Sequence, residues 1–222
     1  MQKSSIKHID KIIKLLKKGI KHFENPIATE IGERTKNPFL VLISCILSLR
    51  TKDSTTGPAA KRLFELANNP YDMVKLSKKQ IEKAIFPVGF YPKKPNWIKQ
   101  VCKILIERYD GNVPDKEEEL LKLPGVGRKC MSITMCYGFF KSGYLPIDAH
   151  CHRIPNRLGW INTKIPEQTE KELKKILPSK YWKDFNDLFV TFGQNICLPT
   201  SPLCSECVIN KYCQKIGVKT HR

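Results

Sequence analysis

The feature that most constrains the fold of this chain is a tight turn between two runs of helical character. Residues 123–127 read Leu-Pro-Gly-Val-Gly, after a helical run from Glu117 and before another that reaches about Phe140. A proline ends a helix, and glycines allow positive φ angles and a close approach of the backbone to a ligand. The second helix would begin with free amide N–H groups at the positive end of its dipole, which suits a phosphate oxygen. The turn is therefore predicted either to grip a nucleic-acid backbone through Gly125 and Gly127 or to connect two packed helices.

Composition favours the first interpretation. The 222 residues include 39 Lys and Arg against 21 Asp and Glu, a formal net charge of +18 that indicates a polyanionic partner. No apolar run reaches the roughly 18 residues of a membrane-spanning helix, and the basic N-terminus lacks the features of a signal peptide. The nine cysteines are therefore expected to be intracellular thiols and metal ligands rather than disulfides. We expect a cytoplasmic protein without a membrane partner, or a nuclear one if the source is a eukaryote.

Hydrophobic periodicity predicts helices and no strands, so the expected fold class is all-α. An amphipathic run at residues 5–24 should dock on the core rather than lie on a membrane. Residues 39–47 are apolar on every side and should form a central buried helix behind the cap Asn37 and the helix-start proline Pro38. Further helices are predicted at residues 95–109, 149–158, 167–176 and 180–196.

Local signals refine the helix ends. Asp53 is expected to cap the helix that follows the central one, and Ser77 with Gln80 to form a capping box. Pro155 is expected to bend or shorten the helix at residues 149–158.

Lys129 falls in the first turn of the helix behind the glycine turn. The helix dipole opposes a further positive charge there, so the pKa of the Lys129 amine should lie below its usual value of about 10.4. A neutral amine is a nucleophile, and its attack on the sugar carbon that carries a base would form an imine and allow elimination of the 3′ phosphate. The alternative is that Lys129 only contacts a phosphate.

The chain between Lys129 and Asp148 is long enough to bring the Asp148 carboxylate back beside the Lys129 amine. The helix climbs about 17 Å to Phe140 at ~1.5 Å per residue, and residues 141–148 span at most about 25 Å when extended. The carboxylate can then take a proton or balance positive charge on the sugar. Asp148 can also N-cap the helix that begins at Ala149, and the two roles are compatible.

The segments LPGVGRK at residues 123–129 and IDAHCHRIPNR at residues 147–157 resemble motifs of the endonuclease III family. The resemblance to this family covers nearly the whole chain. This family consists of helix-hairpin-helix DNA glycosylases with AP-lyase activity. The resemblance implies that Lys129 is the Schiff-base nucleophile and Asp148 the essential aspartate, acting on a flipped-out damaged base between two helical domains. We expect a central domain at residues 30–141 and a second domain formed by residues 1–29 and 142–222.

The same resemblance implies the DNA contacts. Leu49 stands where relatives commonly carry a glutamine that fills the hole left by the flipped base, so a wedge is kept without its hydrogen bonds. Phe90 occupies the position of a second intercalating residue, unless it is a core residue. His150 and His152 point to different helix faces and make a poor metal pair. The remaining DNA contacts are predicted at Lys93, Lys94, Arg128 and His150.

Four cysteines, Cys197, Cys204, Cys207 and Cys213, lie within seventeen residues near the C-terminus. Four soft ligands so close together favour zinc or an iron-sulfur cluster, and the spacing alone leaves both open. The spacing resembles the 4Fe-4S motif of endonuclease III, so a cluster is expected that orders a segment with few apolar residues. The loop at residues 198–203 contains no Lys or Arg and should grip phosphate weakly. The other cysteines, Cys45, Cys102, Cys130, Cys136 and Cys151, should be buried small apolar residues.

We therefore predict a monomeric, bifunctional DNA glycosylase and AP lyase of base excision repair. Its partner would be double-stranded DNA with an abasic site or a damaged base, in particular an oxidised pyrimidine. A mismatch or adenine glycosylase of the same superfamily is the alternative, although such relatives usually carry serine or tyrosine at the position of Lys129. A non-catalytic iron-sulfur protein that binds damaged DNA is the alternative from another class.

Overall fold

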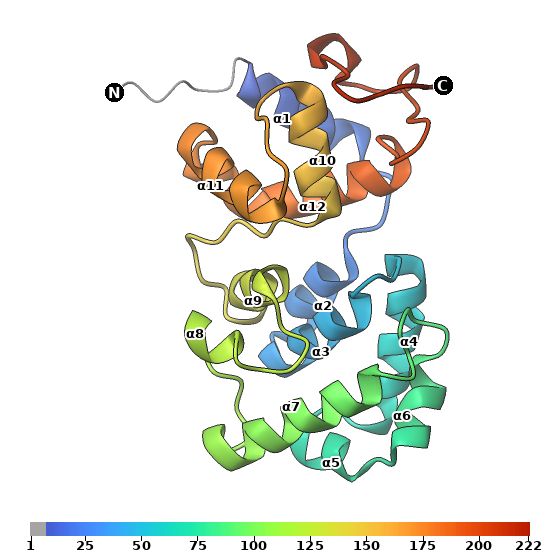
Figure 1. The fold of residues 1–222 in the computed structure, drawn as a ribbon, viewed down its shortest axis with the longest axis vertical. Helices are drawn as coiled ribbons and strands as arrows, with labels where there is room; N and C mark the ends of the chain where they lie inside the picture. Colours follow the sequence, from blue (N-terminus) through green and yellow to red (C-terminus); the bar gives the residue numbers. More distant parts are fainter. Residues whose placement is uncertain (1–7) are drawn as a thin grey trace. The chain divides into compact units, whose positions relative to one another are not determined.

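The computed structural model describes residues 8–222, and this part of the chain contains helices, turns and loops but no strand (Figure 1). The all-α prediction is confirmed for these residues. The chain divides into two compact units: the cysteine unit, with residues 8–25 and Leu145–Arg222, and the hairpin unit, Pro26–Tyr144. The sequence placed the boundaries at 29/30 and 141/142. None of the described helices combines the length and the apolar character that crossing a membrane requires.

The centre of the hairpin unit is α3 (Pro38–Ser48). Its cap is as predicted: Asn37 Oδ1 accepts a hydrogen bond from the backbone N of Phe39 at 2.9 Å, and Pro38 occupies the first turn. Residues 39–47 are all buried, which their uninterrupted apolar sequence predicted. The elements packed on α3 are α2 (Ile27–Thr35), α4 (Asp53–Leu66), α7 (Lys94–Tyr109), α9 (Arg128–Ile133) and a π-helical segment, Thr134–Gly138.

Two short helices complete this part of the unit, α5 (Pro70–Lys75) on α7 and α6 (Lys78–Ile85) on α4. The capping box before α6 is confirmed, because the Ser77 and Gln80 side chains each accept a hydrogen bond from the other's backbone N. The prediction for Asp53 was wrong by one position. Lys52 is the cap residue of α4 and Asp53 its first helical residue, where a carboxylate is still favoured by the helix dipole.

The helices on either side of the glycine turn differ from the prediction. α8 (Glu117–Leu120) ends before residue 123, because Leu123 N donates to Leu120 O and tightens the chain ahead of Pro124. Regular α9 ends at Ile133 rather than near Phe140. Beyond it the Thr134 hydroxyl donates to Cys130 O at 2.9 Å, and Phe139 N donates to Thr134 O, five residues back, which widens the helix.

The core of the cysteine unit contains α1 (Ile9–Gly19), α10 (Ala149–Leu158) and α12 (Trp182–Asn195), with α11 (Pro166–Ile176) packed on α10. The predicted docking of the first helix on the core is confirmed, because its apolar residues Ile9, Ile12, Ile13 and Leu16 are buried. This helix ends at Gly19 and not at residue 24, and residues 5–7 of the prediction lie outside the described part of the chain.

The other helices of this unit match their predicted ranges closely, with a 3-10 turn at Ser179–Tyr181 leading into α12. Pro155 does not shorten α10, which reaches Leu158 and ends at Gly159 with a φ of 77°. Ile154 and Leu158 are buried on either side of the proline, so core packing maintains the helix despite the missing N–H.

Candidate functional site

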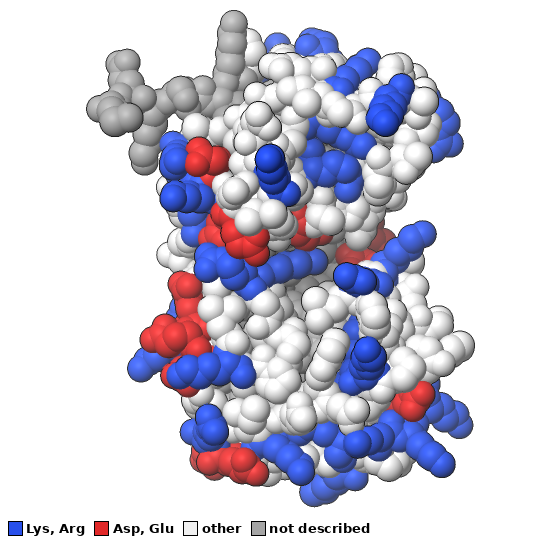
Figure 2. Space-filling view, in the orientation of Figure 1, with Lys and Arg blue, Asp and Glu red and all other residues white. Residues whose placement is uncertain are grey.

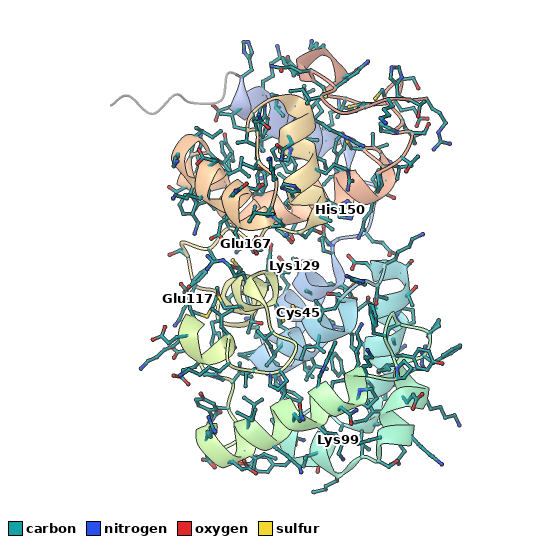
Figure 3. The ribbon with its side chains drawn as sticks, viewed as in Figure 1. Cys45, Lys99, Glu117, Lys129, His150 and Glu167 are labelled. Atoms are coloured by element: carbon teal, nitrogen blue, oxygen red, sulfur yellow. The ribbon has the colours of Figure 1, made fainter. Side chains whose placement is uncertain are left out.

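The glycine turn places Lys129 in the first turn of α9, as the sequence predicted (Figure 3). Gly125 has a φ of 77°, which favours glycine, and a Cβ there would also lie 3.3 Å from Trp97 Cε3. Gly127 corrects the expectation that both glycines have positive φ, since its φ is −97° and it is the N-cap residue of α9. A Cβ added at Gly127 would meet nothing within 4 Å, so its surroundings are open. Arg128, next to it, is exposed.

Phe90 is an exposed ring and not a core residue, with 44% of its surface accessible. It lies in the turn before α7 with a φ of 57°, and the Arg50 guanidinium stacks over its ring at 5.3 Å from the centroid. Gly89, next to Phe90, packs against the segment that follows α3. Its N donates to Thr51 Oγ1 at 3.0 Å, and a Cβ at Gly89 would lie 2.4 Å from Arg50 O. The turn with Phe90 is therefore interlocked with the segment that follows α3 and contains Leu49.

The two neighbouring lysines predicted to contact phosphate have different environments. Lys93 is exposed and available to a phosphate. Lys94 is fully buried, and its Nζ donates to Leu47 O at 2.5 Å and to Leu49 O at 3.0 Å. Burial lowers the pKa of Lys94 to about 8. The prediction of a phosphate contact at Lys94 is therefore wrong, because this ammonium caps the C-terminal end of α3 from inside the unit.

On the face that Figure 2 shows, Lys and Arg side chains are spread over the surface of both units rather than gathered in one patch.

Asp148 is the N-cap of α10, as predicted. Its Oδ1 accepts hydrogen bonds from His150 N and Cys151 N, each at 2.8 Å. Asn186 on α12 fixes the same turn, since its Nδ2 donates to Pro146 O at 3.2 Å and lies 3.6 Å from Cys151 Sγ. Asp148 belongs to the cysteine unit and Lys129 to the hairpin unit, so their pairing stays a prediction.

The two histidines of α10 have separate partners, as their spacing predicted. His150 Nδ1 lies 3.0 Å from Arg153 Nη2, and a Cβ at Gly193 would lie only 2.3 Å from the same nitrogen. His150 therefore packs against α12. His152 Nδ1 lies 2.6 Å from Thr169 Oγ1 on α11.

His152 should make the stability of the protein depend on pH. Burial lowers the pKa of its imidazole from the usual 6.5, and Glu167 opposes this only in part. The unfolded chain then binds more protons below about pH 6.5, so the free energy of unfolding should fall as the pH drops through that value. Urea unfolding at about pH 7.5 and 5.5 should show a larger loss for the wild type than for His152→Gln. Equal losses would contradict this role.

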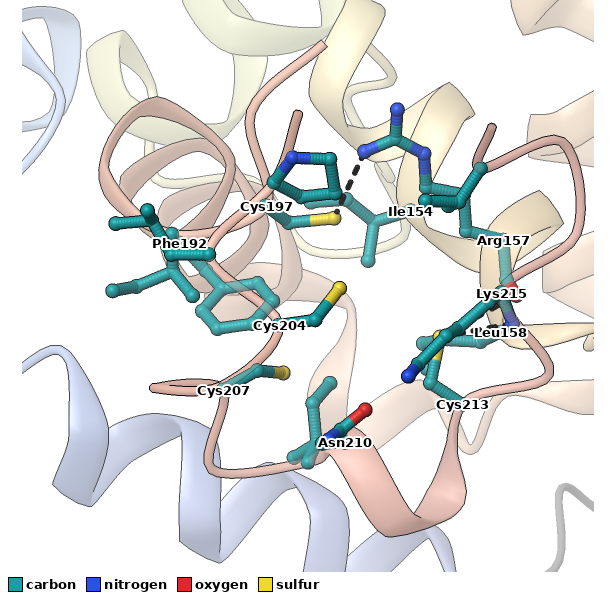
Figure 4. Close-up of a pocket in the computed structure, with 15 residues that line it drawn as sticks. Ile154, Arg157, Leu158, Phe192, Cys197, Cys204, Cys207, Asn210, Cys213 and Lys215 are labelled. Carbon is teal, nitrogen blue, oxygen red and sulfur yellow. Dashed lines mark hydrogen bonds between the residues drawn. The ribbon is translucent and has the colours of Figure 1, made fainter. Parts of the chain in front are cut away.

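Cys197, Cys204, Cys207 and Cys213 line one pocket, and Figure 4 shows their side chains around it. The empty space amounts to about 390 Å³, part of it open to solvent. In residues 8–222 no three His, Cys, Asp or Glu side chains are close enough together to hold a single metal ion. Four thiols that line one pocket are a donor set that suits zinc or an iron-sulfur cluster.

Arg157 is a residue of this pocket that the sequence did not reveal. It reaches from α10, and its guanidinium donates to Cys197 Sγ at 3.3 Å and to Leu198 O and Pro199 O at 2.6 Å each. The loop at residues 198–203, which contains no Lys or Arg, is thus held by an arginine about forty residues earlier in the chain. Burial raises the pKa of the Cys207 thiol to about 11, so the free thiol is protonated near neutral pH.

Comparison with known proteins shows which family this chain belongs to. Residues 43–179 match the model of the HhH-GPD superfamily of base excision DNA repair proteins. Endonuclease III of Thermotoga maritima is 47% identical over 183 residues, which cover 82% of this chain and 85% of that protein. The chain belongs to the endonuclease III family. Endonuclease III-like protein 1 of Gallus gallus is 38% identical, and the match covers 79% of this chain but only 63% of that protein.

Solved structures of endonuclease III share the fold. A trapped covalent intermediate of endonuclease III with DNA has a TM-score of 0.77 and a non-covalent complex with DNA one of 0.80, both at 31% identity and covering 93% of this chain and 95% of theirs. The predicted family and the helix-hairpin-helix glycosylase fold are therefore confirmed. The expectation of a base excision repair glycosylase and lyase is confirmed at the level of the family.

Proposed function

We propose that this member of the endonuclease III family is a bifunctional DNA glycosylase and AP lyase that removes oxidised pyrimidines through Lys129. The observation that carries the proposal is an amine in the first turn of α9, directly behind a turn whose Gly127 is open to a ligand. The helix N-terminus and the backbone of Gly125 and Gly127 suit a phosphate next to the reacting sugar.

In the proposed reaction the Lys129 amine attacks C1′ of the damaged nucleotide, and the bond to the base breaks with its electrons leaving on the base. Asp148 balances the positive charge that builds up on the sugar and accepts a proton from the amine. The departing base takes a proton from water. Asp148 then passes the proton it accepted to the ring oxygen O4′, and opening of the ring gives a protonated imine between Lys129 and C1′. Loss of a proton from C2′ then expels the 3′ phosphate by β-elimination, and water releases the sugar from the lysine.

The proposed DNA contacts of the hairpin unit are three exposed residues and the half-buried Leu49. Arg128 and Lys93 would hold phosphates, while Leu49 and Phe90 would enter the duplex and fill the space of the extruded base. His150, packed against α12, would line the DNA near Asp148. We propose a monomer acting on double-stranded DNA.

The four pocket cysteines would hold a 4Fe-4S cluster, since their thiols line one pocket and their spacing resembles the 4Fe-4S motif of endonuclease III. When bound, the cluster would fix the C-terminal segment by tying four separate points of the chain together. Arg157 would hold the first of these cysteines through its hydrogen bond to Cys197 Sγ.

A mismatch glycosylase is the second candidate. A thermostable thymine-DNA glycosylase shares the fold at 25% identity, with a TM-score of 0.75 over 93% of this chain. Lys129 argues for the bifunctional reaction, because a glycosylase that uses water has no need of an amine at this position.

A panel of duplexes distinguishes these functions. Oxidised-pyrimidine, deaminated and mismatched duplexes would be incubated with the protein, with and without borohydride. We expect excision and strand cleavage on the oxidised pyrimidine, and a covalent adduct when borohydride reduces the imine. Excision confined to T:G or A-containing mispairs, without an adduct, would establish the second candidate instead.

A further inference from the structure

Lys94 is a buried cation whose three hydrogen-bond acceptors are uncharged. Its Nζ donates to Leu47 O at 2.5 Å, to Leu49 O at 3.0 Å and to Thr51 Oγ1 at 3.3 Å. Burying a charge without a carboxylate partner is unfavourable, and only the negative end of the α3 dipole compensates for it here. A methionine or leucine would fill the same space without this cost.

The lysine joins the segment that contains the half-buried Leu49 to the turn that contains the exposed Phe90. It is the first residue of α7, directly after the turn with Phe90, and it bonds to the carbonyl of Leu49 itself. Thr51 Oγ1 receives a hydrogen bond from Lys94 Nζ and another from Gly89 N, so the hydroxyl links both segments. The Arg50 guanidinium, stacked over the Phe90 ring, is a further contact between the two segments.

We propose that Lys94 is a positioning residue for base excision, which holds the Leu49 segment against the Phe90 turn so that both side chains enter the duplex as one rigid wedge. This inference rests on the proposed function. Unstacking a base step costs a few kcal/mol, and a wedge that is already ordered loses less entropy when it enters the DNA. Lys94 would therefore act before the chemistry, during extrusion of the damaged base, and not on the sugar.

The hairpin unit contains a matched control for this role. Lys99, also on α7 (Figure 3), donates from its Nζ to Val74 O at 2.5 Å and to Leu76 O, at the C-terminal end of α5. Lys94→Met and Lys99→Met thus each remove a lysine that caps a helix end in the same unit. Only the first removes a contact to the segments at residues 47–51 and 88–94.

The test separates extrusion from the later chemistry. Single-turnover excision would be measured on a duplex with an oxidised pyrimidine, and strand cleavage on a duplex with a preformed abasic site, which has no base to extrude. Lys94→Met should slow excision by about 100-fold, the loss that a misplacement of about 1 Å can cause, and slow cleavage of the abasic site far less. Lys99→Met should change both rates by less than about twofold. Equal effects of the two substitutions would overturn the inference.

A double-mutant cycle identifies the route of the effect. If Lys94 acts through the wedge, Leu49→Ala should slow excision in the wild type but add little in the Lys94→Met background. Additive effects would mean that Lys94 acts elsewhere.

If Lys94→Met does not fold, Gly89→Ala serves as the second variant, because its Cβ would push Arg50 O away and separate the two segments. It should lose excision selectively. A wild type inactive on every duplex would refute the proposed function and this inference with it, whereas an active wild type with a Lys94→Met variant of normal excision rate refutes only the inference.

Discussion

Replacing Lys129 by alanine should abolish the covalent adduct that borohydride traps on abasic DNA and lower strand cleavage by about 10³-fold or more. Without the amine no imine forms, so the proton at C2′ is not acidified and the 3′ phosphate is not expelled. The measurement is gel analysis of a labelled abasic duplex with and without borohydride. Binding to the duplex should change much less, because Arg128, Lys93 and the glycine turn are intact.

Lys122→Ala is the matched control for this experiment. Lys122 is also a lysine of the hairpin, but it is exposed and paired with Glu119 at 2.8 Å. Its removal should leave the adduct and the cleavage rate within about twofold of wild type, because exposed ion pairs contribute little. If Lys129→Ala cut abasic DNA as fast as Lys122→Ala does, the nucleophile would have to be another group.

Replacing Cys207 by serine should remove most of the bound iron and lower the melting temperature of the protein by about 10 °C. The serine hydroxyl is a poor ligand for iron, and the segment at residues 197–222 has few apolar residues to hold it without the cluster. The wild type should contain about four iron atoms and four inorganic sulfides per chain. Limited proteolysis should then cut the variant first within residues 197–222.

Cys102→Ala is the control for the cysteine substitution. Cys102 is buried in the hairpin unit, and burial raises the pKa of its thiol to about 12, so it serves as a small apolar residue. Its replacement should cost some stability without changing the iron content. One zinc per chain in the wild type, or equal iron in both variants, would contradict the assignment of a 4Fe-4S site.

Most of the local sequence rules succeeded, although the cap predicted at Asp53 was wrong by one position. The apolar run at residues 39–47, the cap at Asn37 and the capping box at Ser77 are confirmed, because periodicity and capping depend on neighbours in the chain. The N-cap role of Asp148 follows from the same kind of rule. Errors occurred where side chains compete with the backbone: the Thr134 hydroxyl bonds to Cys130 O, and the helix after Ile133 widens.

The sequence by itself determined the all-α class and the family, because these depend on periodicity and on the identities and spacing of residues along the chain. It also predicted the residues that would perform the chemistry. Tertiary structure decided what the neighbours of those residues are. Lys93 and Lys94 look alike in the sequence, yet one is exposed and the other caps α3 from within, because adjacent side chains at the start of α7 point about 100° apart around the helix axis. Arg157 contacts the cysteine pocket because packing brings α10 next to residues 197–199. Such hydrogen bonds between distant segments depend on tertiary packing, which local sequence rules do not describe.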